Sequence, residues 1–149
     1  MYAAWHTTLE VARALHARVI VFQCPPSFTP TEQHRRDLVQ FFSHIARDDP
    51  HVVLAWEPRG AWDDELVSRL CRDLGLIHCV DPFRRAPLPG EPAYFRLHGI
   101  GGYRYLYTEG DLLRLLDMCR AKQEVYCLFN NVQMWDSARR FQALVSAAL

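Results

Sequence analysis

Residues 93–98 read AYFRLH, and this stretch decides the fold because it begins with apolar residues and closes on polar ones. Four other runs have the same design: RVIVFQ at 18–23, VVLAWE at 52–57, LIHCVD at 76–81 and VYCLFN at 125–130. Short apolar runs bounded by polar segments are typical of buried strands. A strand that closes on a polar residue and is followed by a helix is the repeating unit of α/β barrels and doubly wound sheets. The sequence therefore predicts an α/β fold.

Most segments beside these runs carry helix signals, while DPFRRAPLPGEP at 81–92 indicates a loop. The expected order is α(βα)₅, with about five strands and five or six helices. Hydroxyl and carboxylate residues at the right spacing indicate helix starts, and a glycine after an apolar stripe indicates a helix end. We expect caps at Thr7 with Glu10, at Thr29 with Pro30 and Glu32, at Thr108 with Asp111, and at Asp136, with Gly75 ending the helix over about 62–74.

Composition narrows the class of protein without selecting a function. Half of the 149 residues are hydrophobic, which suits one domain over residues 1–149 with a sizeable core. Lys and Arg equal Asp and Glu at 17 each, so no global field attracts nucleic acid or membrane. Five cysteines without C-x-x-C spacing argue against structural zinc and a disulfide framework, and fit a reducing cytoplasm. We see no signal peptide or membrane-spanning stretch near the first residue.

The strand ends and the segments after them also resemble a known family. The motifs are FQCPPSF, WEPRGAW, VDPF, YFRLHG followed by YRYLY, and LFNNVQMWDSARRF. In combination and order they resemble the YecE-like family, domain of unknown function 72, over essentially the whole chain. The EPRG and FNN forms are similar to its archaeal-type branch. The resemblance implies a TIM-type barrel, and it implies no particular reaction, because the activity of the family is unsettled.

One departure from the family affects the expected architecture. Members usually begin with G-T-S-G-W and E-x-x-x-x-F-Y segments on the first barrel strands, and neither is present here. The resemblance thus assigns the five runs to barrel strands four to eight. A closed barrel needs roughly 200 residues or more. We therefore expect an incomplete barrel, either a truncated or split product, a homodimer, a partner of a separately encoded amino-terminal half, or an open sheet with two exposed edges.

Three strand-end residues are the candidates for catalysis: Glu57, Asp81 and His98. His98 stands out because an imidazole with a reference pKa of about 6.5 suits proton transfer near neutral pH. A structural histidine is the competing interpretation. The three side chains could also hold a divalent cation, but no H-x-H or H-E-x-x-H spacing supports it, so no metal site is predicted.

Other polar and aromatic residues at the same strand ends are candidates for substrate binding. Alternation puts Arg96 on the same strand face as His98, where it would either pair with Glu57 structurally or hold a ligand. The glycine loop at 99–103 follows the strand that the resemblance numbers seven, next to which barrel phosphate sites often lie. Packing and turn formation are the competing roles. The candidates are Gln23, Arg59, Arg96, Gly101, Gly102, Tyr103, Tyr105, Asn130 and Asn131.

Two classes of function remain open. The first is an enzyme-like site for a phosphate-bearing or other anionic substrate, with unknown cofactor requirements. The second is a non-catalytic module that binds nucleic acid or a nucleotide through arginines and aromatic rings. Zero net charge counts against nucleic acid. An inactive barrel fragment is the third possibility, and nothing in the sequence suggests a membrane partner.

Overall fold

The computed structural model describes residues 2–45 and 52–148. Its internal contacts divide the chain into two compact units, Met1–His78 and Cys79–Leu149, and each unit is described by itself below. Both consist of parallel strands alternating with helices, which confirms the predicted α/β class.

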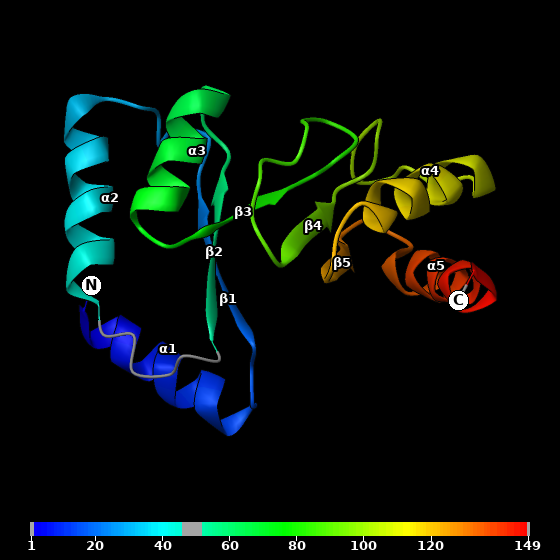
Figure 1. Ribbon diagram of the computed structural model, residues 1–149, viewed down its shortest axis with the longest axis horizontal. Coiled ribbons are helices and arrows are strands. Elements are labelled where there is room, and N and C mark those ends of the chain that lie inside the picture. The colour runs from blue at the N-terminus through cyan, green and yellow to red at the C-terminus, as the bar shows by residue number, and fades with distance from the viewer. Residues whose placement is uncertain (1, 46–51, 149) are drawn as a thin grey trace. The chain divides into compact units, whose positions relative to one another are not determined.

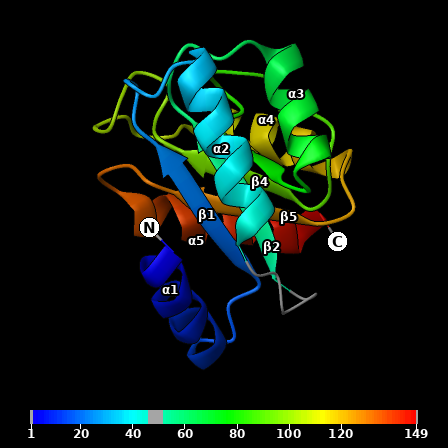
Figure 2. The same cartoon turned by 90° about the vertical axis from the view of Figure 1, so that its left-hand side faces the viewer.

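The first unit is built around the parallel pair β1 and β2. Its elements are α1 (Tyr2–Ala14), β1 (Val19–Cys24), α2 (Glu32–His44), β2 (Val53–Pro58), α3 (Asp64–Asp73) and the start of β3 (Ile77–Val80). The register of the pair runs from Val19 beside Val53 to Cys24 beside Pro58. Figure 2 shows β1 and β2 side by side with α2 in front of them. The helix is held there by aromatic packing, since the rings of Phe22 and Phe42 lie 4.9 Å apart.

The second unit contains the end of β3 and two further parallel strands. Its elements are β4 (Ala93–Leu97), α4 (Glu109–Arg120), β5 (Val125–Phe129) and α5 (Met134–Ala148) (Figure 1). β3 pairs with β4, and β4 pairs with β5 along its whole length. Along the chain the strand order is β1-β2-β3-β4-β5, all parallel. This is the sequential order of a TIM-type barrel, here with five strands, because a doubly wound sheet reverses its order at a switch point.

The core of the second unit lies between its strands and the two helices. Phe95 and Leu97 are fully buried and pack with Leu112 and Leu115 of α4 and Phe141 of α5. Because side chains alternate along a strand, the intervening residues of β4 lie on its opposite face. His98 directly follows the last residue of β4 and continues the alternation on that opposite face.

The connection between the third and fourth strands is a loop, as its proline-rich sequence predicts. The connection over residues 81–92 contains turns and bends but no helix, so the order α(βα)₅ was wrong by one helix. Its sequence DPFRRAPLPGEP explains the difference, because prolines remove backbone donors and disfavour helical geometry in the preceding residue.

Helix starts were predicted with mixed success. Thr108 and Asp111 form the predicted capping box of α4, and Gly75 takes the predicted left-handed conformation with φ 58°. The Thr7 cap was wrong, because Thr7 lies within α1 and its hydroxyl donates to the carbonyl of Ala3. An exposed threonine inside a helix can bond to the preceding turn in this way, which makes its cap signal ambiguous.

The starts of α2 and α5 also differ from the predicted ones. The N-cap of α2 is Thr31, whose hydroxyl accepts from the backbone N–H of His34 at 3.1 Å, two residues after the predicted Thr29. Thr31 as cap places Pro30 before the helix, where a missing N–H costs no helical bond. Asp136 lies within the first turn of α5, where a carboxylate still favours the positive end of the helix dipole.

Candidate functional site

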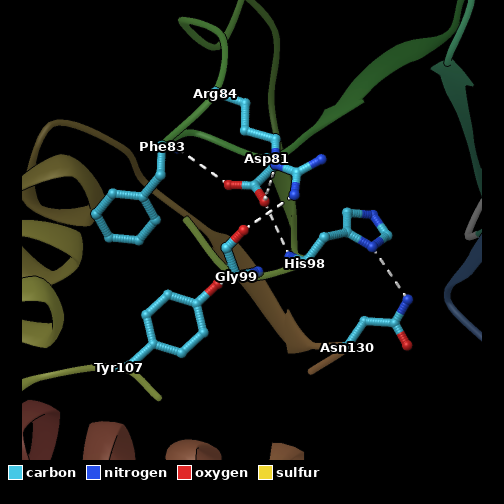
Figure 3. A network of polar contacts seen from close by, with 7 residues as sticks. All are labelled: Asp81, Phe83, Arg84, His98, Gly99, Tyr107 and Asn130. Carbon is cyan, nitrogen blue, oxygen red and sulfur yellow. Dashed lines mark hydrogen bonds and ion pairs between the residues drawn. The ribbon is translucent and has the colours of Figure 1, made fainter. Parts of the chain in front are cut away.

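Asp81 organises a polar cluster at the carboxyl ends of β3, β4 and β5 (Figure 3). Its carboxylate is buried directly after β3 and accepts from two backbone N–H groups, those of Phe83 at 3.1 Å and His98 at 2.9 Å. The Nε of Arg84 lies 3.6 Å from Oδ2. Because both oxygens serve neighbouring loops, Asp81 fixes the position of His98 within the strand-end cluster.

His98 is held at its ring as well as at its backbone. Its Nδ1 lies 3.2 Å from Nδ2 of Asn130, which follows β5. The backbone N–H of Asn130 donates to the carbonyl of Leu97 at 2.9 Å, so the β4–β5 pairing continues up to the cluster. In this orientation of the amide the NH₂ group donates, so Nδ1 accepts and a neutral ring would carry its proton on Nε2. The predicted candidates Asp81, His98 and Asn130 are thereby brought together.

Gly99 links this cluster to the loop that follows. Its N–H donates to the Tyr107 hydroxyl at 2.8 Å, and its carbonyl accepts from Nη2 of Arg84 at 3.0 Å. Its φ of 88° is in the left-handed region, and an added Cβ would overlap the carbonyl oxygen of Gly102. Only glycine fits this position without strain.

Tyr107 contacts the cluster through Gly99 and is almost fully buried. Its ring lies 5.8 Å from that of Phe83 and 5.4 Å from that of Phe129. Burial raises the pKa of its hydroxyl to about 12, although the hydrogen bond from Gly99 acts in the opposite direction. Tyr107 is therefore a neutral structural acceptor, which agrees with the packing role that aromatic residues bordering helices usually have.

The glycine loop is closed on itself by two consecutive turns. Gly102 donates its N–H to the carbonyl of Gly99 at 3.1 Å, and Tyr105 donates to Gly102 at 2.9 Å. The N–H groups of Gly99 and Gly102 thus serve the loop itself. Tyr103, which is 57% exposed, remains the outward-facing aromatic side chain of the predicted set.

Tyr105 and Asn131 bond to each other and to residues that do not belong to the cluster. The Tyr105 hydroxyl donates to Oδ2 of Asp111 at 2.8 Å, and its carbonyl accepts from Nδ2 of Asn131 at 2.9 Å. Asn131 is fully buried, and its Nδ2 also lies 3.4 Å from the Ser137 hydroxyl. Among the residues that the structure describes, Oδ1 of Asn131 has no hydrogen-bond partner, so it can still accept one.

The remaining candidates lie outside this cluster. In the first unit, Gln23 stands beside Glu57 in the β1–β2 register, Glu57 is buried, and Arg59 is exposed just beyond β2. Arg96 lies within β4 beside Leu128, and Gly101 is exposed in the glycine loop. The pairing of Arg96 with Glu57 stays a prediction, as do the ligand contacts of all nine substrate-binding candidates.

Gly99, Arg84 and Tyr107 are not among the named site candidates. The sequence does place Gly99 in the glycine loop, Arg84 on a loop at the same strand ends, and Tyr107 beside a helix where packing is the expected role. The dipeptide HG at a strand end was the signal for Gly99, because a glycine there often marks a backbone conformation that other residues avoid. The specific contacts of Arg84 and Tyr107 had no local signal in the sequence. Their roles depend on contacts with Gly99, which is distant from Arg84 in sequence.

The described residues contain neither a metal-binding group nor a membrane-spanning helix. Over residues 2–45 and 52–148, no group of three or more His, Cys, Asp or Glu side chains is placed to hold a metal ion. None of the helices in these ranges combines the length and the apolarity needed to cross a membrane.

Comparison with known proteins places the chain among uncharacterised relatives. It resembles the crystal structure of a DUF72 family protein from Thermotoga maritima MSB8, with a TM-score of 0.75, 24% identity, and coverage of 97% of this chain and 65% of that one. A DUF72 family protein from Enterococcus faecalis V583 gives a TM-score of 0.66 at 21% identity, with 93% and 66% covered.

The chain spans less than two thirds of the length of either structure. These likenesses support the fold alone. No curated protein matches the sequence. The family described as protein of unknown function DUF72 matches residues 2–148, and the chain belongs to the DUF72 family.

Proposed function

We propose that the carboxyl ends of β3, β4 and β5 form an enzyme-like site for a small anionic, phosphate-bearing substrate, with His98 as the proton-transfer group. The observation that carries the proposal is the double restraint on His98. Asp81 holds its backbone N–H, and Asn130 holds Nδ1 of its ring. Preset orientation and tautomer are what a general acid or base needs, because rotation of the ring would otherwise misplace the proton.

The restraint defines the chemistry that His98 would perform. With the proton on Nε2, the neutral ring can donate a hydrogen bond to a substrate oxygen and stabilise the negative charge that develops there. Full proton transfer would start from the imidazolium, which gives up one proton and returns to the neutral ring. Asn130 can donate to Nδ1 through its NH₂ group in the neutral form, and a rotated amide would accept from Nδ1–H through Oδ1 in the imidazolium. Asp81 is not a base in this scheme, because both of its oxygens already accept hydrogen bonds from backbone groups.

Arg84 supplies positive charge beside this donor. Its side chain is 46% exposed, yet the ion pair with Asp81 and the hydrogen bond to Gly99 fix the guanidinium. A guanidinium has more N–H donors than these two contacts use, and its planar fork matches phosphate oxygens. Arg96 would contribute from the strand face that it shares with His98 by alternation.

A nucleotide-binding module is the second candidate, and the exposed Tyr103 favours it. Tyr103 is 57% exposed, the exposed Arg104 follows it, and its carbonyl accepts from the N–H of Val132 at 2.8 Å. An anchored aromatic ring beside an arginine can stack a base. The balanced net charge favours one nucleotide over a long polyanion.

Thermal protection by inorganic phosphate tests the anion site. At constant ionic strength, phosphate should raise Tm relative to chloride, because a ligand that binds the native state stabilises it. The increase should be lost in Arg84→Ala, Arg96→Ala and His98→Ala. Arg120→Ala is the matched control, because Arg120 lies on α4 and pairs with the exposed Asp117. Equal protection in all of these variants would contradict the proposed site.

A nucleoside monophosphate separates the two candidates. If the module binds nucleotides through stacking, the nucleotide should protect the fold more than phosphate does, and Tyr103→Ala should remove only that excess. If the nucleotide and phosphate protect equally, the nucleotide-binding function is rejected and the anion site remains.

A further inference from the structure

Two cysteines meet between α4 and β5, away from the polar cluster. Cys119 lies in the last turn of α4 and Cys127 in the middle of β5, and their sulfur atoms are 3.7 Å apart. Cys127 shares the helix-facing side of β5 with Val125 and Phe129, while Cys119 lies beside the buried stripe of α4. The sulfurs therefore face each other across the edge of the core.

The geometry allows a covalent bond after a small movement. A disulfide requires the sulfurs to approach to about 2.05 Å, which is a shift of under 2 Å from the present contact. Cys119 lies one residue from the end of α4, where a helix turn yields more readily than in its interior. Both side chains are half-buried, so a small reagent can reach them from solvent.

The two thiols are also chemically unequal. The contact with the Cys127 sulfur lowers the pKa of Cys119, against the effect of burial. The same contact, together with burial, raises the pKa of Cys127. By contrast, burial alone raises the pKa of Cys71 to about 12, which keeps it an unreactive thiol. The direction of these shifts favours Cys119 as the attacking thiol and Cys127 as its partner, an order that serine variants test.

We propose that Cys119 and Cys127 form a peroxide-sensitive dithiol site that closes to a disulfide. The Cys119 thiolate attacks one oxygen of a hydroperoxide, forming a sulfenic acid and releasing the other oxygen as water or an alcohol. The Cys127 sulfur then attacks the sulfenic sulfur, forming the S–S bond and expelling water. The two thiols lose two electrons in total, and the peroxide accepts them.

The chain offers a clean way to map this bond. Trypsin can cleave after Arg120 and Lys122, which both lie between the two cysteines. A disulfide would then be the sole link between the peptides spanning 115–120 and 123–139. The full chain, folded and dilute, is treated with hydrogen peroxide, alkylated, denatured and digested under non-reducing conditions for mass spectrometry.

The wild-type protein should lose two of its five alkylatable thiols and two hydrogen atoms in mass, and the linked peptide pair should appear. Retention of all five thiols, or oxidation of Cys119 beyond sulfenic acid without the linked pair, would overturn the proposal. So would a disulfide that joins either cysteine to Cys24, Cys71 or Cys79 as the main product.

Serine variants test the order of attack and need no assay of function. In Cys127→Ser, Cys119 should stop at a sulfenic acid that dimedone traps, whereas in Cys119→Ser the Cys127 thiol should persist. Cys71→Ser is the matched control and should still form the linked pair. If a variant fails to fold, the wild-type chain in urea provides the comparison, because mixed pairings should replace the selective one. Equal selectivity in urea would show that sequence proximity, not the fold, pairs the thiols.

Discussion

The loops of the two units are held mainly by different kinds of contact. In the first unit, Phe28 in the loop after β1 packs against His34 with ring centroids 4.5 Å apart and against Trp62 with centroids 5.7 Å apart. In the second, Asp81 and Tyr107 hold the loops through hydrogen bonds to backbone N–H groups. Aromatic packing restrains a loop without prescribing one hydrogen-bond direction, whereas buried polar contacts fix each donor and acceptor.

The polar contacts of the second unit are the reason for placing the proposed chemistry there. Proton transfer needs a defined tautomer and donor direction, and the second unit supplies both to His98 through Asp81 and Asn130. We call the stacked residues Phe28, His34 and Trp62 of the first unit the aromatic clamp. The loop here is also closely packed, because a Cβ on Gly60 would overlap the Phe28 carbonyl oxygen. That tightness fixes the shape of the loop and leaves the orientation of polar groups to other contacts.

The largest effect is expected for the aromatic clamp. Trp62 is 3% exposed and its indole N–H donates to the carbonyl of Phe28 at 2.6 Å. Trp62→Ala should lower the free energy of unfolding by about 3–5 kcal/mol, while Trp62→Phe should cost only about 1 kcal/mol. Urea unfolding measures both. If Trp62→Phe costs as much as Trp62→Ala, the hydrogen bond rather than the packing holds this loop.

We call Asp81 with its two backbone donors, Phe83 and His98, the polar clamp. Removing it should cost less stability than removing Trp62, but should increase the motion of His98 more. Asp81→Ala leaves the backbone N–H groups of Phe83 and His98 without their acceptor, at a cost of about 3 kcal/mol. Asp81→Asn keeps one acceptor oxygen and should cost less. Amide hydrogen exchange at His98 should be faster in both variants. Unchanged exchange in Asp81→Ala would show that the clamp does not depend on this carboxylate.

Tyr107 should give a pH-dependent contribution to stability. Its pKa is raised to about 12 in the folded protein from an ordinary value of 10.0, so folding favours the protonated hydroxyl. The stability that it contributes should be complete below pH 10 and be lost as the pH rises towards 12. Tyr107→Phe should cost about 1–2 kcal/mol at neutral pH, with a gap to wild type that narrows above pH 10. A constant gap would argue against burial of this hydroxyl.

The smallest effect is expected for the capping box of α4. Burial tends to raise the pKa of Asp111, but hydrogen bonds from Thr108 and Tyr105 outweigh it and lower the pKa below 3.8. The contribution is therefore complete above pH 3.8 and lost as the pH falls through the folded-state value. Asp111→Asn should cost about 1 kcal/mol at pH 7 and nothing at the acidic end. A cost that is equal at both pH values would contradict the charged cap.

The sequence predicted the elements whose signals are local. The five apolar runs became strands β1 to β5 within one residue of their predicted bounds, because burial of consecutive apolar residues needs no distant information. The Thr108–Asp111 box was also predicted, since its contacts close within one helical turn. The Thr7 and Thr29 caps failed because a nearby alternative hydrogen bond or threonine was equally available.

The candidate cluster was predictable only in part. Strand ends gave Asp81, His98 and Asn130, because parallel strands bring their carboxyl ends to one edge. The tautomer of His98 and the role of Gly99 depend on contacts between segments separated in sequence, such as Asn130 with His98 and Tyr107 with Gly99. Such contacts are set by packing of the whole unit, which residue patterns alone do not encode.

The protonation state of the His98 ring tests the central claim most directly. Long-range ¹H–¹⁵N NMR of the imidazole distinguishes Nε2–H from Nδ1–H in the neutral ring. We predict the Nε2–H tautomer in wild type, mixed tautomers in Asn130→Ala, and a shift of the His98 Nε2 resonance on addition of phosphate. An Nδ1–H ring in wild type, or Nε2 resonances that phosphate leaves unmoved, would contradict the account of His98 as a preset proton donor to an anionic substrate.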